Sequence, residues 1–163
     1  MKKYTIHYNF CATADIEVLA NSKEEAREKA DMIDIPLSDF DYDLNEKSII
    51  DEEDVPDLRI LIEKAEHIIS KAEEEDIEFI LNPWPRVTTV YWDGNKMEYQ
   101  YQLVSFLFWN NERNEIGFNT VESAADYGLS EIPEIEQLEI CQSIIAQAEE
   151  NGIINHQKSN ENA

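Results

Sequence analysis

Glycine, cysteine and histidine are all scarce in this sequence. Its 163 residues include four glycines and no G-x-G-x-x-G or P-loop spacing, which excludes nucleotide binding through a phosphate-cradling loop. Cys11 and Cys141 stand far apart and belong to no C-x-x-C pair, so we expect two buried free thiols, with a disulfide or a reactive thiol as the alternatives. The three histidines show no paired ligand spacing. We therefore expect no metal, no cofactor and no enzymatic activity, although carboxylate acid–base chemistry at an unnamed pair of acids stays open.

Long apolar runs are also missing. No stretch approaches the ~18 residues that a membrane-spanning helix needs. Polar residues at Thr5, His7 and Asn9 interrupt the start of the chain, which does not have the pattern of a signal peptide. We expect a cytoplasmic protein with no membrane partner.

Basic residues are the third scarcity. Thirteen Lys and Arg stand against 36 Asp and Glu, which gives a formal net charge of −23. Residues 1–30 are neutral, residues 31–80 carry −14, and residues 114–157 contain no Lys or Arg. Such a field opposes direct contact with nucleic acid and favours a basic protein surface as partner. The simpler interpretation is that the acids keep a small protein soluble.

The residues that are present predict an α+β fold. Alternating apolar residues indicate strands, and apolar residues three and four apart indicate amphipathic helices. The expected strands are 4–10, 16–20, 87–92, 97–109 and 116–118; the expected helices are 22–33, 54–75, a short one over 120–128, and 130–151. Residues 34–54 are expected to form an acidic connector. We expect one antiparallel sheet of about five strands, with the two long amphipathic helices packed on one face.

One domain over residues 1–154 is expected, followed by a disordered tail at 155–163. An offset of 76 residues aligns Glu63 and Ile68 of one long helix with Glu139 and Ile144 of the other. Two similar halves, 1–80 and 81–154, are therefore one alternative. Shared composition of two Glu-, Ala- and Ile-rich helices is the other.

Residues 3–33 contain two alternating strands followed by Ser22-Lys23-Glu24-Glu25, which has the form of a helix capping box. This strand–strand–helix pattern resembles the DpnD/PcfM-like module of phage and conjugative-element proteins. The resemblance covers about a fifth of the chain and implies an accessory protein of a mobile element. It brings no catalytic residues.

Two segments begin like known binding motifs but lack the residues that would bind calcium or DNA. Asp39, Asp41 and Asp43 begin a calcium-type loop, but Leu44 occupies the glycine position and Ile50 the position of the bidentate glutamate. Residues 120–140 have the shape of a helix-turn-helix. The second helix of that motif would carry four glutamates and no base, which opposes DNA binding.

The chain is best interpreted as an acidic, non-enzymatic binding protein for a basic or nucleic-acid-handling protein, such as a mobile-element inhibitor or a DNA mimic. The alternative is an assembly module that forms a homodimer through its aromatic-rich sheet. The residues expected at a partner surface are the acids Asp39, Asp41, Asp43, Asp51, Glu52, Glu53, Glu131, Glu134, Glu136 and Glu139, with the tryptophans Trp84, Trp92 and Trp109.

Overall fold

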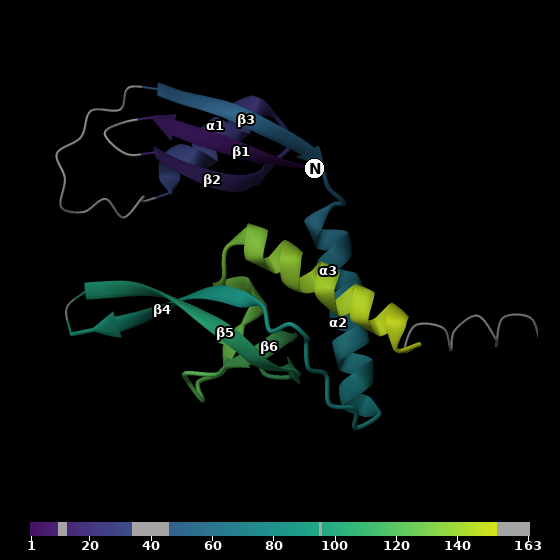
Figure 1. Ribbon diagram of the computed structural model, residues 1–163. Helices are drawn as coiled ribbons and strands as arrows, with labels where there is room; N and C mark the ends of the chain where they lie inside the picture. The colour runs from purple at the N-terminus through teal and green to yellow at the C-terminus, as the bar shows by residue number, and fades with distance from the viewer. Residues whose placement is uncertain (10–12, 34–45, 95, 153–163) are drawn as a thin grey trace, which may run out of the picture. The chain divides into compact units, whose positions relative to one another are not determined.

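The computed structural model describes residues 1–9, 13–33, 46–94 and 96–152 (Figure 1). The chain divides into two compact units, unit 1 over Met1–Asp57 and unit 2 over Leu58–Ala163. Both units contain helices and an antiparallel sheet, so the α+β class is confirmed. The single sheet of about five strands is wrong, because the strands form one sheet of three and a second sheet of four.

Unit 1 is a three-stranded sheet with one helix on one face. Its elements are β1 (Lys2–Asn9), β2 (Thr13–Ala20), α1 (Lys23–Met32) and β3 (Glu46–Asp54), and the strand order is β2-β1-β3. The expected hairpin and capped helix are present: the Ser22 hydroxyl accepts the Glu25 N–H at 3.2 Å. Alternation along the strands directs Tyr4, Ile6 and Val18 into a small core with Ala26 and Ala30 of α1.

The strand β3 is the main departure from the expected connector over 34–54. Aspartate and glutamate disfavour strands, so the local composition of Asp51–Asp54 predicts a loop. In the structure β3 pairs with β1, where Lys3 lies opposite Glu53 and Lys2 lies opposite Asp54. Opposite charges on paired strands stabilise a sheet. Ile49, which lies opposite Ile6, packs against the core of unit 1. The lysines and Ile6 of β1 therefore stabilise β3 as a strand, although its own composition does not favour one.

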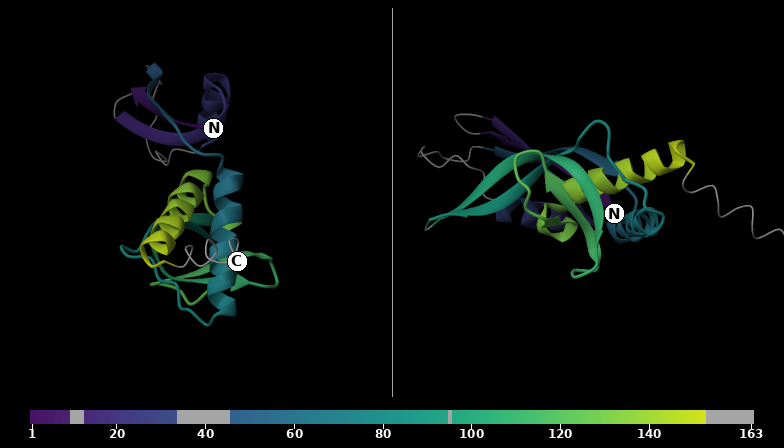
Figure 2. Two further views of the ribbon diagram at one scale, coloured as in Figure 1. Left: turned by 90° about the vertical axis from the view of Figure 1, so that its right-hand side faces the viewer. Right: turned by 90° about the horizontal axis from the view of Figure 1, so that it is seen from below.

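Unit 2 packs two long helices against a four-stranded sheet. Its elements are α2 (Leu58–Glu74), β4 (Arg86–Asp93), β5 (Lys96–Asn110), β6 (Glu115–Thr120), β7 (Tyr127–Gly128), the 3-10 turn η1 (Leu129–Glu131) and α3 (Glu134–Glu150). The strand order is β4-β5-β6-β7. Figure 2 shows α2 and α3 on the same face of this sheet. Their apolar stripes bury Ile69 and Ile144 against Val104, Leu107 and Phe118 of the strands.

Two further expectations change in unit 2. The short helix over 120–128 is wrong, because β6 ends at Thr120 and the chain then runs to β7. The last helix begins at Glu134 rather than near Ser130, because η1 and Pro133 precede it. The boundary between the two compact units lies between residues 57 and 58, so both helices of the 76-residue offset lie in unit 2. The tail at 155–163 lies outside the described residues.

Candidate functional site

The four consecutive acids of β3 do not form one surface. Side chains alternate along a strand, so Glu52 and Asp54 share the face that carries α1, while Asp51 and Glu53 lie on the opposite face. The cluster that the sequence suggested is therefore divided between two surfaces of unit 1.

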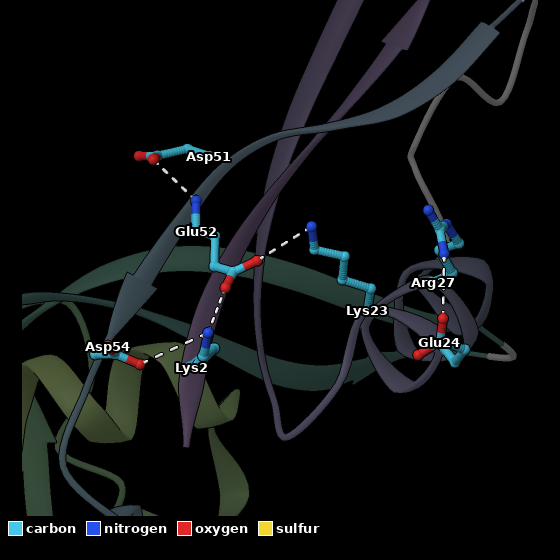
Figure 3. A network of polar contacts seen from close by, with 7 residues as sticks. All are labelled: Lys2, Lys23, Glu24, Arg27, Asp51, Glu52 and Asp54. Atoms are coloured by element: carbon cyan, nitrogen blue, oxygen red, sulfur yellow. Dashed lines mark hydrogen bonds and ion pairs between the residues drawn. The ribbon is translucent and has the colours of Figure 1, made fainter.

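On the α1 face, Glu52 is neutralised by two lysines (Figure 3). The Lys2 ammonium donates a hydrogen bond to the Glu52 carboxylate and lies 3.9 Å from Asp54. Lys23 Nζ of α1 lies 3.5 Å from the second Glu52 oxygen. The hydrogen bond from Lys2 lowers the pKa of Glu52, and the same contact raises the pKa of Lys2. These ion pairs join β1, β3 and α1 and leave little uncompensated charge here.

The opposite face of the sheet is also mixed in charge. Lys3 lies between Glu53 of β3, at 3.0 Å, and Glu17 of β2, at 3.6 Å. The Asp51 carboxylate accepts the N–H of Glu52 at 2.9 Å. His7 Nδ1 lies 2.7 Å from an Asp15 oxygen. Among the described acids of unit 1, Asp15, Glu17 and Glu53 thus link neighbouring strands.

Two predicted partner-binding acids of unit 2 have structural contacts. The Glu131 carboxylate accepts the Gly128 N–H and pairs with Arg113. Glu136 accepts two hydrogen bonds from Thr88 of β4. Glu134 and Glu136 lie in the first turn of α3, where the positive end of the helix dipole favours acids. Glu139 is exposed one turn further along. The local fold therefore accounts for acids at this end of α3.

The three tryptophans have different surroundings. Trp84, in the segment before β4, is 48% exposed. Trp109 is half-buried and packs against the core of unit 2. The Trp92 side chain lies outside the described part of the structure, although its backbone pairs with Met97. The predicted acids Asp39, Asp41 and Asp43 also fall outside the described residues.

Within the described ranges, an exposed group of acids stands at the C-terminal end of α2, and the predicted partner-binding residues did not include it. We define the acidic helix end as Glu73, Glu74, Glu75, Asp76 and Glu78, five carboxylates in six residues. All five residues are exposed. Lys71 lies 3.8 Å from Glu75 and is the base in the last turn of α2.

This position is unfavourable for the helix. The C-terminal end of a helix carries partial negative charge, and each acid there costs about 0.3–1 kcal/mol at low salt. The helix closes with two hydrogen bonds, Ile77 N–H to Ala72 O at 2.8 Å and Asp76 N–H to Glu73 O at 3.1 Å. This closure requires a left-handed residue, usually glycine. Asp76 fills that position with φ 54°, so an aspartate adopts a conformation that L-residues disfavour.

Two exposed apolar residues lie in and just after the acidic helix end. Ile77, between Asp76 and Glu78, and Ile80 are each 39% exposed, whereas Phe79 and Leu81 are buried in the core of unit 2. Gln147 of α3 fixes this segment by donating to the Ile80 carbonyl at 2.6 Å and accepting the Asn82 N–H at 3.4 Å. The site therefore combines exposed carboxylates with two exposed apolar side chains on an anchored segment.

The acids are too dispersed to act on a single ion. Across the described ranges no three His, Cys, Asp or Glu side chains converge closely enough to hold a metal. A row of separate carboxylates is better suited to several cations than to one. The Lys and Arg side chains of a partner protein could each pair with one of these carboxylates.

The remaining features of the described residues show no catalytic arrangement. A shallow hollow of about 470 Å³ beside Ser105 and residues 119–126 contains two carboxylates. One of them, Glu122, accepts the Leu103 N–H, and the other, Asp126, accepts the Asn119 amide, so both hold the local fold. Burial raises the pKa of the Cys141 thiol to about 12, which keeps it protonated and unreactive.

None of the helices in the described ranges is both long and apolar enough to cross a membrane. Comparison with known proteins gives no relative: no family model, no curated protein and no solved structure matches the chain.

Proposed function

We propose that this chain is a non-enzymatic binding protein whose acidic helix end engages a basic protein surface. The observation that carries the proposal is the run of carboxylates at the C-terminal end of α2, the end at which they destabilise the helix. A partner that brings lysine and arginine side chains to this end would relieve both the mutual repulsion of the acids and their conflict with the helix dipole.

Contrast with the other acids supports the choice of this site. Glu52 and Glu53 pair with lysines of unit 1, and Glu136 is held by Thr88. The acidic helix end has Lys71 against five carboxylates. Long-range attraction from the net charge of −23 would speed the encounter with a basic partner. Ile77 and Ile80 would then supply short-range apolar contact.

A basic protein that handles nucleic acid remains the partner class that we favour. Such proteins present clusters of Lys and Arg that normally meet phosphates. Imitation of DNA over a whole face receives less support, because the acids of β3 are divided between two faces of their sheet and two of them, Glu52 and Glu53, pair with lysines. The resemblance of residues 3–33 to mobile-element modules is compatible with an inhibitor of a host protein.

The test is binding of a fluorescently labelled oligo-arginine peptide of about ten residues, followed by anisotropy at several salt concentrations. The variant that neutralises the site carries Glu73→Gln, Glu74→Gln, Glu75→Gln and Asp76→Asn. We expect it to bind about tenfold more weakly than the native chain at low salt. Binding by the native chain should itself weaken steeply as salt increases.

A matched control removes the same four charges from exposed positions elsewhere. It carries Glu28→Gln, Glu63→Gln, Glu112→Gln and Glu150→Gln. We expect this control to lose less than about threefold, because only the diffuse field changes. Equal losses in the two variants would show that net charge alone attracts the peptide, and the proposed site would be abandoned.

A further inference from the structure

The last helix of unit 2 ends in Asn151-Gly152, the one place in the sequence where a glycine follows an asparagine. Helix α3 ends at Glu150, and Asn151 is its C-cap with φ −83° and ψ −1°. Gly152 has φ +73°, the left-handed conformation that commonly closes a helix and that glycine adopts without strain. The helix end therefore explains the glycine, and this glycine leaves the backbone nitrogen beside the Asn151 amide without a hindering side chain.

The surroundings of the two residues are open. Asn151 is exposed, and within the described ranges its side-chain amide has no hydrogen bond. A Cβ added at Gly152 would meet nothing within 4 Å. The backbone is held by two bonds, from the Asn151 N–H to the Gln147 carbonyl at 3.0 Å and from the Gly152 N–H to the Glu149 carbonyl at 3.2 Å. Helix ends fray, so these bonds open more readily than those in the middle of α3.

Other asparagines of the described ranges are less suited to reaction with the next backbone nitrogen. The Asn110 side-chain oxygen accepts two backbone N–H groups, each at 3.1 Å, and the Asn119 amide donates to two oxygens of the loop after β6. A proline follows Asn82, so no N–H is present there. Asn111 and Asn114 precede glutamates, whose side chains hinder the backbone nitrogen. Sequence and structure thus single out Asn151.

We propose that Asn151 is a site of spontaneous deamidation. The Gly152 backbone nitrogen gives its proton to hydroxide and attacks the Asn151 Cγ, which closes a five-membered succinimide; the Nδ2 group leaves as ammonia with a proton from water. Water then adds to one ring carbonyl and breaks its bond to the ring nitrogen, leaving a carboxylate and an α- or β-aspartyl link at position 151. The net reaction consumes one water and releases one ammonia. Both reacting groups belong to adjacent residues, which makes the attack intramolecular.

The product adds a negative charge at an unfavourable place. The C-terminal end of a helix carries partial negative charge, and Glu149 and Glu150 already stand at this end of α3. Lys64 of α2 lies 3.5 Å from Glu149 and compensates one of them. The new carboxylate therefore weakens the same turn whose opening permits the reaction. Asn151→Asp supplies the α-aspartyl product directly, and we expect its melting temperature to fall by about 1–4 °C.

The experiment is incubation of the full chain at mildly alkaline pH, followed by tandem mass spectrometry of its peptides at successive times. Replacement of an amide by an acid raises the mass of a peptide by one unit, and fragmentation assigns the gain to a residue. We expect Asn151 to react before Asn111 and Asn114, at a rate that rises with hydroxide concentration. Urea should speed the reaction, since it removes the two backbone hydrogen bonds that hold the helix end.

Two variants test the role of each residue. Asn151→Gln keeps an amide but would have to close a larger ring, so the mass gain at position 151 should be lost. Gly152→Ala places a methyl group beside the attacking nitrogen and should slow the reaction severalfold. The matched control is Asn111→Gln, which removes an exposed asparagine elsewhere and should leave the rate at Asn151 unchanged. A thermal melt of each variant establishes that it is folded.

Four results would overturn the inference. The first is no mass gain at Asn151 in the folded chain over the period in which the urea-unfolded chain reacts. The second is a gain at Asn111 or Asn114 that is as fast, and the third is a Gly152→Ala chain that reacts at the native rate. The fourth is an Asn151→Asp chain that melts no lower than the native one. None of them bears on the acidic helix end, which contains neither residue of the reacting pair.

Discussion

Glu136 of α3 holds the edge strand of the larger sheet through one residue, Thr88. The two carboxylate oxygens of Glu136 accept the Thr88 N–H and the Thr88 hydroxyl, each at 2.6 Å. Strand β4 stands first in the order β4-β5-β6-β7, so it is an edge strand of this sheet. The carboxylate therefore satisfies a backbone donor that faces away from the sheet and blocks this position against pairing with another chain.

Replacing Glu136 should lower the free energy of unfolding of the chain. Glu136→Ala leaves the part-buried Thr88 donors without their acceptor, and we expect a loss of about 1–3 kcal/mol in urea denaturation. Glu136→Gln keeps one acceptor oxygen and should lose less. Glu150→Ala, at an exposed position of the same helix, serves as the control. A Glu136→Ala chain as stable as this control would show that the two hydrogen bonds contribute nothing.

Substitutions at Asp76 should stabilise the protein, since the native residue has an unfavourable charge and an unfavourable conformation. Asp76→Asn removes the charge from the helix end and tolerates φ 54°, so we expect a gain of about 0.3–1 kcal/mol. Asp76→Gly also removes the side-chain conflict and should gain about 1 kcal/mol or more. Asp76→Ala removes the charge but keeps a side chain that disfavours the left-handed backbone at φ 54°. Thermal melts should rank the stabilities as Gly, Asn, Ala; if the native chain melts highest, the helix end is not under the inferred conflict.

Glu66 on α2 should make stability depend on pH. Burial, and then the nearby carboxylates Glu115 and Glu63, raise the pKa of Glu66 above its ordinary 4.5. A glutamate with a raised pKa in the folded state favours the fold while it is protonated and opposes it once the pH exceeds that pKa. Glu66→Gln should therefore stabilise the chain at pH 7 by up to about 1 kcal/mol, and the gain should vanish as the pH falls below 4.5.

The control for Glu66→Gln is Glu112→Gln, an exposed acid in the turn between β5 and β6. It corrects for the change in net charge, which itself alters the pH dependence of a strongly acidic protein. Urea denaturation across the pH range provides the measurement. A gain from Glu66→Gln that is equal at pH 7 and pH 4 would contradict the assignment.

The contact between Lys2 and Glu52 should be visible in an NMR titration. Lys2 lowers the pKa of Glu52, so this carboxyl supports the fold above the ordinary glutamate pKa of 4.5 and loses that contribution as the pH falls through the lowered value. Lys2→Met should move the Glu52 pKa upward toward 4.5. Lys64→Met, in unit 2, should leave it in place. An unchanged Glu52 pKa in Lys2→Met would mean that Lys23 or solvent governs this group.

Periodicity predicted the long elements well because their information is local. The stripe that includes Ala65, Ile68 and Ala72 predicted α2, and the alternation of Tyr4 and Ile6 predicted β1. The capping of α1 by Ser22 was also readable, since the donor and the acceptor are three residues apart. The partner-binding surface stays a prediction for the peptide-binding experiment above.

Local periodicity could not predict the conformation of segments that depend on partners distant in the sequence. The Asp51–Asp54 run becomes a strand because Lys2 and Lys3 lie opposite it, about 50 residues away in the chain. The acidic helix end was visible in the sequence as four consecutive acids, Glu73 to Asp76, but the predicted partner-binding residues did not include them. Their position at the C-terminal end of the helix followed from the expected bounds 54–75, which differ from the observed end at Glu74 by one residue, but the prediction did not use it.

The sequence by itself determined the charge, the α+β class, the two long helices and the scarcity of residues for nucleotide or metal binding. Composition and short-range periodicity carry this information, and neither depends on which segments meet in space. Only the tertiary structure decided which acids are compensated. Glu52 meets lysines, Glu136 meets Thr88, and the carboxylates after Ala72 meet the negative end of their own helix. Identical side chains therefore stabilise the fold at one place and oppose it at another, because electrostatic energy depends on the distance to the opposite charge.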